Sequence, residues 1–491
     1  MTSSHVIHEI EPVYDKNSRV LLLGTMPSPK SRETGFFYGH PQNRFWKVLA
    51  LLFDEPTPET IEEKRGLCLR HHIALWDVVS SCDIEGASDA SIKNAKPNDL
   101  AQILNAAPIQ AVFTTGTKAG QLYKKLCEPA TSIPCTVLPS TSPANSRVSL
   151  AELCTTYKQA LSPYLEFDPK YPVLDVPEVV RLEQSIASSG TSLYTLMHRA
   201  GRFLAYEAKK YLEQKSDCRE SDRNITKPKE SDCSEINHNE PERSKAASGQ
   251  NQFYTPTPNQ LHVSILCGHG NNGGDGWVAA DYLAKAGYHV DLISSVSAQE
   301  IKAEPAHTTA CEIEHGIKCE IEHEAEYRVE RETEHETKQE IEHKSKYKAG
   351  RKIAASPKSK QTIHLLINPT NEEVEASLSK ADLIIDAILG TGFSGDTVRE
   401  PFSTWIELAN QQKVREKARN TDQPTSNTRN SRIIAADVAS GFSAQTGTAA
   451  KPCIVADHTV TMITLKTGLV QPSAKTYCGT IRVAPLAVFD L

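Results

Sequence analysis

The stretch Gly268-His-Gly-Asn-Asn-Gly-Gly-Asp-Gly276 says more about the fold than any other part of the sequence. It follows an apolar β-type run, His262–Cys267, and precedes a helix-like run, Trp277–Gly287. A second β-type run, His289–Ser294, comes next. This order of strand, glycine-rich loop, helix and strand is typical of α/β proteins that bind a phosphate with backbone N–H groups and a helix dipole. Because glycine has no Cβ, the loop backbone can approach an anion closely.

Two further glycine-rich loops follow apolar strands later in the chain. One strand ends at Asp386 and leads into the turn Gly390–Gly395, and another delivers Asp437 and then Ser440. The carboxyl ends of parallel strands share one edge of a sheet. We therefore expect Asn272 to lie close to the polar residues of these two loops.

Taken alone, the spacing Gly268-x-Gly270-x-x-Gly273 also matches the dinucleotide fingerprint of NAD-dependent oxidoreductases. Such a site usually has an acidic residue at the end of the second strand, whereas here that strand ends Ser294-Ser295. An oxidoreductase is therefore one alternative function, and a non-catalytic nucleotide-binding module is the other.

Length and composition set the broad class of protein. A chain of 491 residues has room for two or three domains, and its formal net charge of -7 gives no global sign of nucleic-acid or membrane binding. The 12 cysteines include no Cys-x-x-Cys pair and read as reduced thiols. No apolar run approaches the ~18 residues of a membrane helix, and no signal peptide is recognised. We expect a cytoplasmic protein without a membrane segment.

The composition predicts two domains, 1–165 and 172–491. Two polar, low-complexity stretches, about 213–257 and 298–361, are expected to be disordered insertions in the second domain. The second stretch repeats Glu-x-Glu-His four times, first at Glu312–His315. The alternative for this repeat is a soft-metal site, because Cys311/His315 and Cys319/His323 are spaced i,i+4.

The motifs of the second domain together resemble the NAD(P)H-hydrate epimerases. The resemblance rests on Asn271-Asn-Gly-Gly-Asp-Gly276, Asp386-Ala-Ile-Leu-Gly-Thr-Gly392, Asp437-Val-Ala-Ser-Gly441 and the helical segment Leu196-Met-His-Arg-Ala-Gly201. It covers about 172–491. Members of this family interconvert the R and S epimers of hydrated NADH and NADPH (NADHX and NADPHX) at C6 of the nicotinamide ring. That activity is what the resemblance implies here.

The resemblance also implies the roles of individual residues. Asp437 is our candidate catalytic acid/base, because epimerisation at a carbinolamine-like carbon needs proton transfer. One potassium ion per site would bind Asn272, Asp386 and Ser440, whose oxygens suit a hard cation. The NADPHX-binding residues would be Asn271, Asn272, Gly273, Gly274, Asp275, Gly390, Thr391, Gly392, Phe393, Ser394, Gly395, Asp396 and Asp437.

The sequence departs from the usual family pattern at a few positions. Ala439 stands where the family usually has proline, Phe442-Ser443 stands where it has Leu-Asp, and His198 stands where an acidic residue is common. As partners we expect NADHX or NADPHX, a second copy of the chain in a homodimer, and an NAD(P)HX dehydratase acting on the product.

The first domain interleaves aromatic and polar residues in a way that suits a flipped base. The stretches are Gly24-Thr-Met-Pro-Ser28, Phe36–Trp46 and the Ser/Pro-rich loop Leu138–Asn145. Aromatic rings can stack on a flipped base, and an amide can read its edge. Hydroxyls and backbone N–H groups in the last stretch can bind phosphates. Phe45 and Trp46 themselves are expected to be core residues.

This set resembles the uracil-DNA glycosylase superfamily, specifically its hypoxanthine (deoxyinosine) branch, over about 1–165. By that resemblance Asn43 is the catalytic residue, which positions water or stabilises the departing base. Tyr38 would stack on the base, and 140–145 would form a DNA-intercalating loop. The reaction would hydrolyse the N-glycosidic bond of hypoxanthine or uracil in damaged DNA, without a metal or cofactor. The DNA- and base-binding residues would be Tyr38, His40, Ser140, Ser142 and Asn145.

The sequence thus predicts a fusion of two enzymes. Both domains are expected to be three-layer α/β/α sandwiches with mainly parallel sheets. The first is uracil-DNA-glycosylase-like and the second Rossmann-like.

Overall fold

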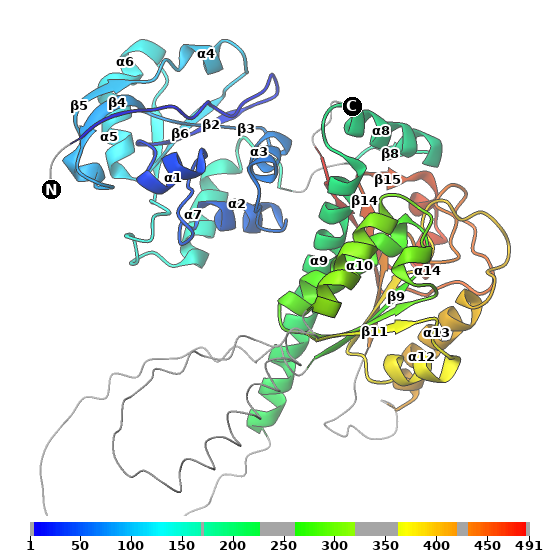
Figure 1. Cartoon of the computed structure of the whole chain (residues 1–491). Coiled ribbons are helices and arrows are strands. Elements are labelled where there is room, and N and C mark those ends of the chain that lie inside the picture. Colours follow the sequence, from blue (N-terminus) through cyan, green and yellow to red (C-terminus); the bar gives the residue numbers. More distant parts are fainter. Residues whose placement is uncertain (1–3, 168–170, 226–260, 320–361, 420–430, 488–491) are drawn as a thin grey trace, which may run out of the picture. The chain divides into compact units, whose positions relative to one another are not determined.

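The computed structural model describes residues 4–167, 171–225, 261–319, 362–419 and 431–487 (Figure 1). Contacts divide the chain into two compact units, Met1–Tyr171 and Pro172–Leu486, each of which is described by itself. Among the described residues, none of the helices combines the length and the apolar character that crossing a membrane requires.

The first unit is built on a four-stranded parallel sheet in the order β3-β2-β6-β7. A second, antiparallel sheet has the order β1-β4-β5. The strands are β1 (Ser4–Ile7), β2 (Val20–Gly24), β3 (Ile73–Asp77), β4 (Val79–Ile84), β5 (Lys93–Pro97), β6 (Ala111–Thr115) and β7 (Cys135–Leu138).

The helices of the first unit close its apolar core. The apolar helix α2 buries Phe45 and Trp46, as the sequence predicts, and α3 and α7 both begin with capping boxes. The helices are α1 (Pro29–Thr34), α2 (Phe45–Phe53), α3 (Ile61–Arg70), α4 (Ala101–Leu104), α5 (Thr117–Leu126), α6 (Glu128–Thr131) and α7 (Leu150–Leu161), with a 3₁₀ turn, η1, at Asp89–Ser91.

The second unit has a seven-stranded sheet in which all neighbouring strands are parallel, in the order β11-β10-β9-β12-β13-β14-β16. The order reverses between β9 and β12, which is where ligands bind in open α/β sheets. The strands are β9 (His262–Cys267), β10 (His289–Ser294), β11 (Thr362–Ile367), β12 (Leu383–Ala387), β13 (Arg432–Ala436), β14 (His458–Met462) and β16 (Thr480–Ala484), and β15 (Leu465–Lys466) pairs with β8 (Val173–Leu174).

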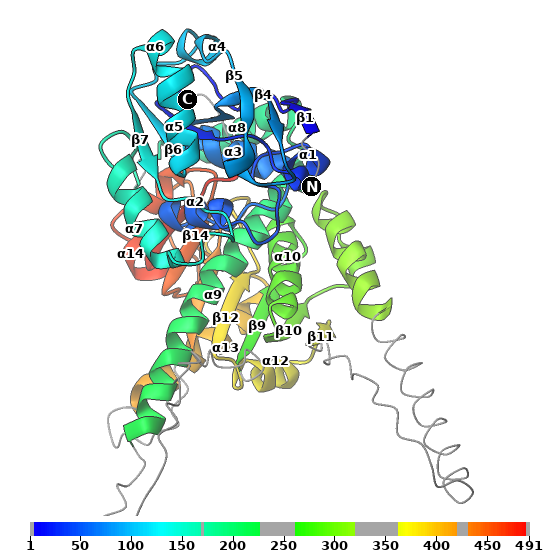
Figure 2. The same cartoon turned by 90° about the vertical axis from the view of Figure 1, so that its left-hand side faces the viewer.

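Helices cover both faces of this sheet (Figures 1 and 2). Successive residues of β9 point to opposite faces: Leu266 joins the cluster that contains Trp405 of α13, while Ile265 and Cys267 lie against Gly276 of α10. The expected fold class, α/β with mainly parallel sheets, is therefore confirmed. The helices are α8 (Val176–Ser188), α9 (Leu193–Ile225), α10 (Asn271–Lys285), α12 (Asn371–Leu378), α13 (Phe402–Arg419) and α14 (Ala474–Tyr477), with 3₁₀ turns η3 (Ala298–Glu300) and η4 (Thr467–Val470).

Three boundaries differ from those predicted. Helix α10 begins at Asn271 and not at Trp277, so the glycine motif forms its first turns. Helix α9 continues to Ile225, inside the first expected insertion, and 306–319 are helical inside the second. Residues 226–257 and 320–361 of these insertions lie outside the described residues.

The glycines of the motif serve packing within the protein more than approach to an anion. A Cβ on Gly273 would lie 1.9 Å from the carbonyl oxygen of Gly268, and one on Gly268 would lie 2.0 Å from that of Ile388. A Cβ on Gly270 would meet nothing within 4 Å. The first turn of α10 is therefore held directly against the ends of β9 and β12.

We predict that Gly273→Ala lowers the unfolding free energy of the second unit by about 3 kcal/mol or more, because the added Cβ overlaps backbone that cannot move aside. The matched control Gly270→Ala should cost no more than about 1 kcal/mol, the difference between the two residues at a helix N-cap. Urea unfolding of the full chain measures both, with the transition of the first unit as an internal reference. Equal midpoints for the two variants would contradict the packing described.

Two candidate active sites

Hydrogen bonds connect the three residues predicted to bind potassium, which lie at the carboxyl edge of the seven-stranded sheet. The amide Nδ2 of Asn272 donates to the carbonyl oxygen of Leu389 at 3.0 Å, and the backbone N–H of Leu389 donates to Oγ of Ser440 at 2.9 Å. Ser440 donates to Asp386 twice, from Oγ at 2.5 Å and from its backbone N–H at 2.8 Å. The structure thus brings together Asn272, Asp386 and Ser440, as the sequence predicts.

The donor set of these residues fits a hard cation. Asp386 is fully buried, and burial raises the pKa of its carboxyl to about 6 even though Ser440 donates hydrogen bonds to it. Oδ1 of Asn272 is buried without a hydrogen-bond partner among the described residues. A buried oxygen without a partner and a buried carboxylate are both costly. An oxygen-ligated potassium ion would satisfy both groups.

A second cluster is centred on Asp437, the residue after β13. Its backbone adopts φ 61°, a left-handed conformation that is strained for a non-glycine residue. Its Oδ1 accepts from Nζ of Lys466 at 2.6 Å and more weakly from the backbone N–H of Met462 at 3.2 Å. Lys466, only 1% exposed, also donates to Oγ1 of Thr461 and to the carbonyl oxygen of Met462. The ammonium thus fixes one carboxylate oxygen, and Oδ2 has no hydrogen-bond partner among the described residues.

Two further acids interact with this pair. Burial, together with the charges of Asp437 and Glu183, raises the pKa of Asp275 well above its usual range. Burial and the charge of Asp437 raise the pKa of Glu183, on α8, to about 7. Acids with raised pKa values near a lysine-bound carboxylate are an arrangement typical of acid/base chemistry.

Sequence reasoning missed both Glu183 and Lys466. Glu183 lies on an amphipathic helix that carries no glycine motif, so its pattern gave no signal. Lys466 did carry a sequence signal, because it comes shortly after the apolar strand β14 and directly before Thr467-Gly468.

The remaining nucleotide-binding candidates lie around the N-terminus of α10. Asn271 is exposed in the first turn of the helix, while Gly273 and Gly274 are buried. Residues 390–396 form a half-buried to exposed loop after β12, and a Cβ on Gly390 would lie 3.1 Å from the Cβ of Asn272. The two glycine-rich segments therefore adjoin each other, and the first backbone N–H groups of α10 are available to an anion.

Two of the departures from the family pattern, Ala439 and Phe442, fall at packing positions. Ala439 and Phe442 are both 0% exposed, and the ring centroid of Phe442 is 5.9 Å from that of Tyr477. These two side chains belong to the apolar core beneath the loop. They leave the contacts of Asp437 and Ser440 intact.

The predicted soft-metal pairs are Cys311/His315 and Cys319/His323, but the described contacts of the two cysteines are with other histidines. Cys311 lies 3.7 Å from Nε2 of His307, and Cys319 lies 3.6 Å from Nε2 of His315, whereas His323 lies outside the described residues. No group of three or more His, Cys, Asp or Glu side chains in the described part of the chain is placed to hold a metal ion.

The candidate site of the first unit also lies at the carboxyl edge of its parallel sheet. Tyr38 follows α1 in a left-handed conformation, φ 53°, and its hydroxyl is 2.9 Å from Oγ1 of Thr115 at the end of β6. One face of its ring stacks on Phe45 with centroids 3.8 Å apart. Only the opposite face of Tyr38 can therefore stack on a base.

Asn43 is held by the loop that follows β7. Its Oδ1 accepts from Oγ1 of Thr141 at 2.9 Å and from the backbone N–H of Phe45 at 3.0 Å. Its amide Nδ2 has no hydrogen-bond partner among the described residues. Because its oxygen is already used, Asn43 presents a donor. This favours stabilisation of the departing base over the alternative of accepting a hydrogen bond from water.

The residues predicted to bind DNA differ in how firmly the surrounding structure holds them. Asn145 donates from Nδ2 to the carbonyl oxygen of Ser140 at 2.9 Å, and Arg44 donates to the carbonyl oxygen of Asn145, so the loop is tied to the Asn43 segment. Ser142 is half-buried within the same loop. His40 is exposed, and its Nδ1 accepts only from the backbone N–H of Gln42.

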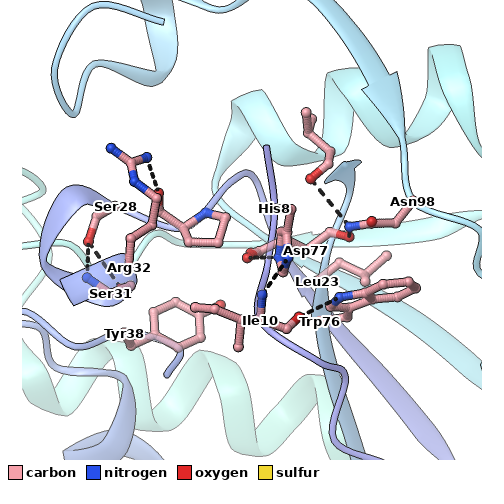
Figure 3. Close-up of polar contacts among 12 residues, drawn as sticks. His8, Ile10, Leu23, Ser28, Ser31, Arg32, Tyr38, Trp76, Asp77 and Asn98 are labelled. Atoms are coloured by element: carbon pink, nitrogen blue, oxygen red, sulfur yellow. Dashed lines mark hydrogen bonds and ion pairs between the residues drawn. The ribbon is translucent and has the colours of Figure 1, made fainter. Parts of the chain in front are cut away.

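Sequence reasoning missed a buried His8–Asp77 pair at the same edge (Figure 3). Nε2 of His8 is 2.9 Å from Oδ2 of Asp77, and both side chains are almost fully buried. Asp77 ends β3, whereas His8 follows β1, 69 residues away in the sequence. The pairing of β1 with β4, together with a bridge between Val13 and Leu75, brings the two together.

Comparisons with known proteins agree with this division of the chain. A family model described as YjeF-related protein N-terminus matches 193–468, and one described as uracil DNA glycosylase superfamily matches 11–163. The hypoxanthine DNA glycosylase of Methanosarcina acetivorans is 34% identical over 28% of this chain and 87% of its own length. The chain belongs to both families, to the glycosylase superfamily through its first unit and to the YjeF-related family through its second.

Relatives of the second unit are named for NAD(P)H-hydrate repair. The NAD(P)H-hydrate epimerase of Pirellula staleyi is 28% identical over 46% of this chain and 73% of its own length. A bifunctional NAD(P)H-hydrate repair enzyme of Escherichia coli K12 is 28% identical over 47% of this chain but only 32% of its own length. This chain therefore matches about a third of that bifunctional relative. These matches favour the epimerase interpretation over an NAD-dependent oxidoreductase.

We predict that potassium raises the melting temperature of the second unit at pH 7.5 and that this gain disappears below about pH 6. Without a cation, the pKa of Asp386 is higher in the folded chain than in the unfolded chain. The unfolding free energy of the second unit therefore falls as the pH rises toward 6, because the unfolded chain ionises this carboxyl more easily. Bound potassium offsets that loss only while the carboxylate is ionised. Thermal unfolding in potassium chloride and in choline chloride measures the difference.

Asp386→Asn is the control for this titration and should show no potassium-specific gain at any pH. Equal stabilisation of the unsubstituted chain by both salts would contradict a potassium site at these residues.

Proposed function

We propose that the chain is a bifunctional repair protein. Its second unit epimerises the R and S forms of NADHX and NADPHX, and its first unit hydrolyses the N-glycosidic bond of deaminated bases in DNA. The family memberships and the names of the relatives support both halves. The buried ion pair of Asp437 and Lys466, near two acids whose pKa values are raised, is the observation that carries the first activity, and the orientation of Asn43 carries the second.

In the proposed epimerase reaction Asp437 moves the proton of the C6 hydroxyl. Lys466 holds Oδ1 of Asp437, so Oδ2 accepts that proton. The C6–N1 bond then breaks to give an aldehyde at C6, and N1 takes a proton from a neighbouring acid, for which Asp275 and Glu183 are the candidates. Rotation about the adjacent carbon–carbon bond and reclosure by the reverse steps give the other epimer. Each proton returns to the group that supplied it.

The nucleotide is proposed to bind across the N-terminus of α10 and the loop 390–396. Backbone N–H groups of the first turn of α10 would donate to the phosphates. Asn272, Asp386 and Ser440 would hold one potassium ion, which would offset the charge of Asp386 and add positive charge near those phosphates.

Asp437→Asn should lower the rate of epimerisation by at least about 100-fold, because the amide cannot accept the hydroxyl proton. Lys466→Met should lower it as well and also destabilise the second unit by about 3 kcal/mol or more, since it leaves Asp437 buried without its partner. The assay supplies a mixture of NADHX epimers with an S-specific dehydratase and follows recovery of NADH, with potassium and with sodium.

Complete recovery of both epimers by the unsubstituted chain, faster than without enzyme, is the expected result. Recovery that stalls at the S fraction on the enzyme-free timescale would contradict the epimerase and leave the second unit as a nucleotide-binding module.

In the proposed glycosylase reaction the first unit acts on a base flipped out of the DNA. The uncovered face of Tyr38 stacks on the base, and Nδ2 of Asn43 donates to it as negative charge develops on the departing ring. The loop 140–145 binds the DNA strand, and Ser140, Ser142, Asn145 and His40 are its candidate contacts. A water molecule attacks C1′ of the sugar as the C1′–N bond to the base breaks. A hydroxyl then replaces the base at C1′, and the proton that the water loses ends on the departed base. No metal or cofactor takes part in this proposal.

Asn43→Ala should lower base release by at least about 100-fold while DNA binding changes only a few-fold, since the lost donor acts on the leaving group. Thr141→Val should cause a smaller loss, about 10-fold, because it removes one of the two hydrogen bonds to Oδ1 of Asn43 and so loosens the amide without removing it. Gel analysis of cleaved abasic sites in oligonucleotides that contain deoxyinosine or deoxyuridine measures both. Full activity of Asn43→Ala would overturn its role.

The proposal includes the setting of the two reactions. An NAD(P)HX dehydratase is the functional partner, because epimerisation only supplies that enzyme with the S form. We further propose that the second unit forms a homodimer and works in the cytoplasm on both NADHX and NADPHX.

A further inference from the structure

The buried pair of His8 and Asp77 has no part in the hydrolysis as proposed. Oδ2 of Asp77 lies 2.9 Å from Nε2 of His8. Its other oxygen, Oδ1, has no hydrogen-bond partner among the described residues. Asp77 as a whole is only 4% exposed, yet Oδ1 is not among the fully buried polar atoms without a partner, so this oxygen is open to solvent or a ligand.

The contacts of His8 fix the carboxylate as an acceptor. The backbone N–H of Ile10 donates to Nδ1 of His8 at 3.3 Å, so the proton of a neutral His8 lies on Nε2 and is donated to Asp77 (Figure 3). The backbone N–H of His8 in turn donates to the carbonyl oxygen of Ser80 at 2.7 Å, which holds the ring in place.

Gly24 places the open oxygen beside the stacking ring. A Cβ on Gly24 would lie 2.1 Å from Oδ1 of Asp77 and 3.4 Å from the hydroxyl oxygen of Tyr38. The carboxylate and the hydroxyl end of the Tyr38 ring therefore flank the same glycine. We therefore place the polar edge of a base that stacks on the face of Tyr38 opposite Phe45 near Asp77.

Deamination turns one ring nitrogen of a base from a hydrogen-bond acceptor into a donor, and a carboxylate can distinguish the two forms. Adenine N1 is a hydrogen-bond acceptor, whereas hypoxanthine carries a proton at N1. Cytosine and uracil differ in the same way at N3. A carboxylate oxygen accepts from the N–H and repels the lone pair of the parent base.

We propose that Oδ1 of Asp77, held by His8, accepts the ring N–H that deamination creates and thereby selects deaminated bases over their amino parents. This inference rests on the proposed glycosylase function. Asp77 is the specificity residue, His8 and Gly24 position it, and Asn43 remains responsible for departure of the base.

The test uses Asp77→Asn in the full chain. The amide oxygen of the new side chain would accept from His8 in place of Oδ2, which leaves an amide nitrogen, a donor, where Oδ1 stood. The substitution therefore inverts the polarity presented to the base and nearly preserves its shape. The substrates are single-stranded oligonucleotides that contain deoxyinosine, 1-methyldeoxyinosine or deoxyadenosine, since single strands remove differences in base pairing.

The unsubstituted chain should release hypoxanthine at least about 100-fold faster than 1-methylhypoxanthine or adenine, because a site built around an N–H rejects analogues that lack it. Asp77→Asn should slow release of hypoxanthine about 10- to 100-fold and narrow its preference over adenine to within about 10-fold, as expected for loss of a charge-assisted hydrogen bond. Gly24→Ala, whose Cβ displaces Oδ1 without changing any charge, should lose the same preference.

The possible failures are distinguishable. An unchanged preference in both variants, with unchanged DNA binding, would overturn the role of Asp77 and leave the glycosylase proposal standing. If Asp77→Asn does not fold, Gly24→Ala decides by itself. If the unsubstituted chain releases no base from any substrate, the proposed glycosylase function fails and this inference fails with it.

Discussion

Glycines at strand ends allow the close approaches on which both candidate sites depend. In the second unit, the contact of Gly273 with Gly268 holds the first turn of α10 against β9 and β12. That contact places Asn272 beside Leu389 and brings Asp275 into range of Asp437. In the first unit, the missing side chain of Gly24 leaves room for the carboxylate of Asp77 beside Tyr38. Any side chain at these glycines would move a polar group away from its partner.

The two sites meet the cost of buried charge in different ways. In the second unit the Asp437 carboxylate has a lysine partner, and burial together with the charge of Asp437 raises the pKa values of two neighbouring acids, Asp275 and Glu183. In the first unit Nε2 of His8 makes a single hydrogen bond with Asp77, and the amide of Asn43 presents a donor. An ionic cluster suits repeated proton transfer, whereas preorganised hydrogen bonds suit recognition of a base and stabilisation of a leaving group.

Much of the fold follows from sequence patterns because the strands are short apolar runs with polar ends. The bounds of β9 and β10 agree with the predicted runs, and Asn272, Asp386 and Ser440 meet as expected from strand ends of one parallel sheet. The predicted start of α10 was wrong because glycine disfavours helix in isolation. Tertiary packing makes this stretch helical. His8 could not be predicted, since it reaches Asp77 through a strand pairing between distant segments. Glu183 likewise depends on how α8 packs.

Two separate active sites on one chain are best tested by crossing two variants with two assays. Purified full chain, Asn43→Ala and Asp437→Asn would each be assayed for base release and for NADHX epimerisation. Each substitution should abolish one reaction and leave the other within about twofold, as expected for independent sites. A substitution that abolishes both reactions, or an unsubstituted chain that performs neither, would contradict the presence of two separate sites.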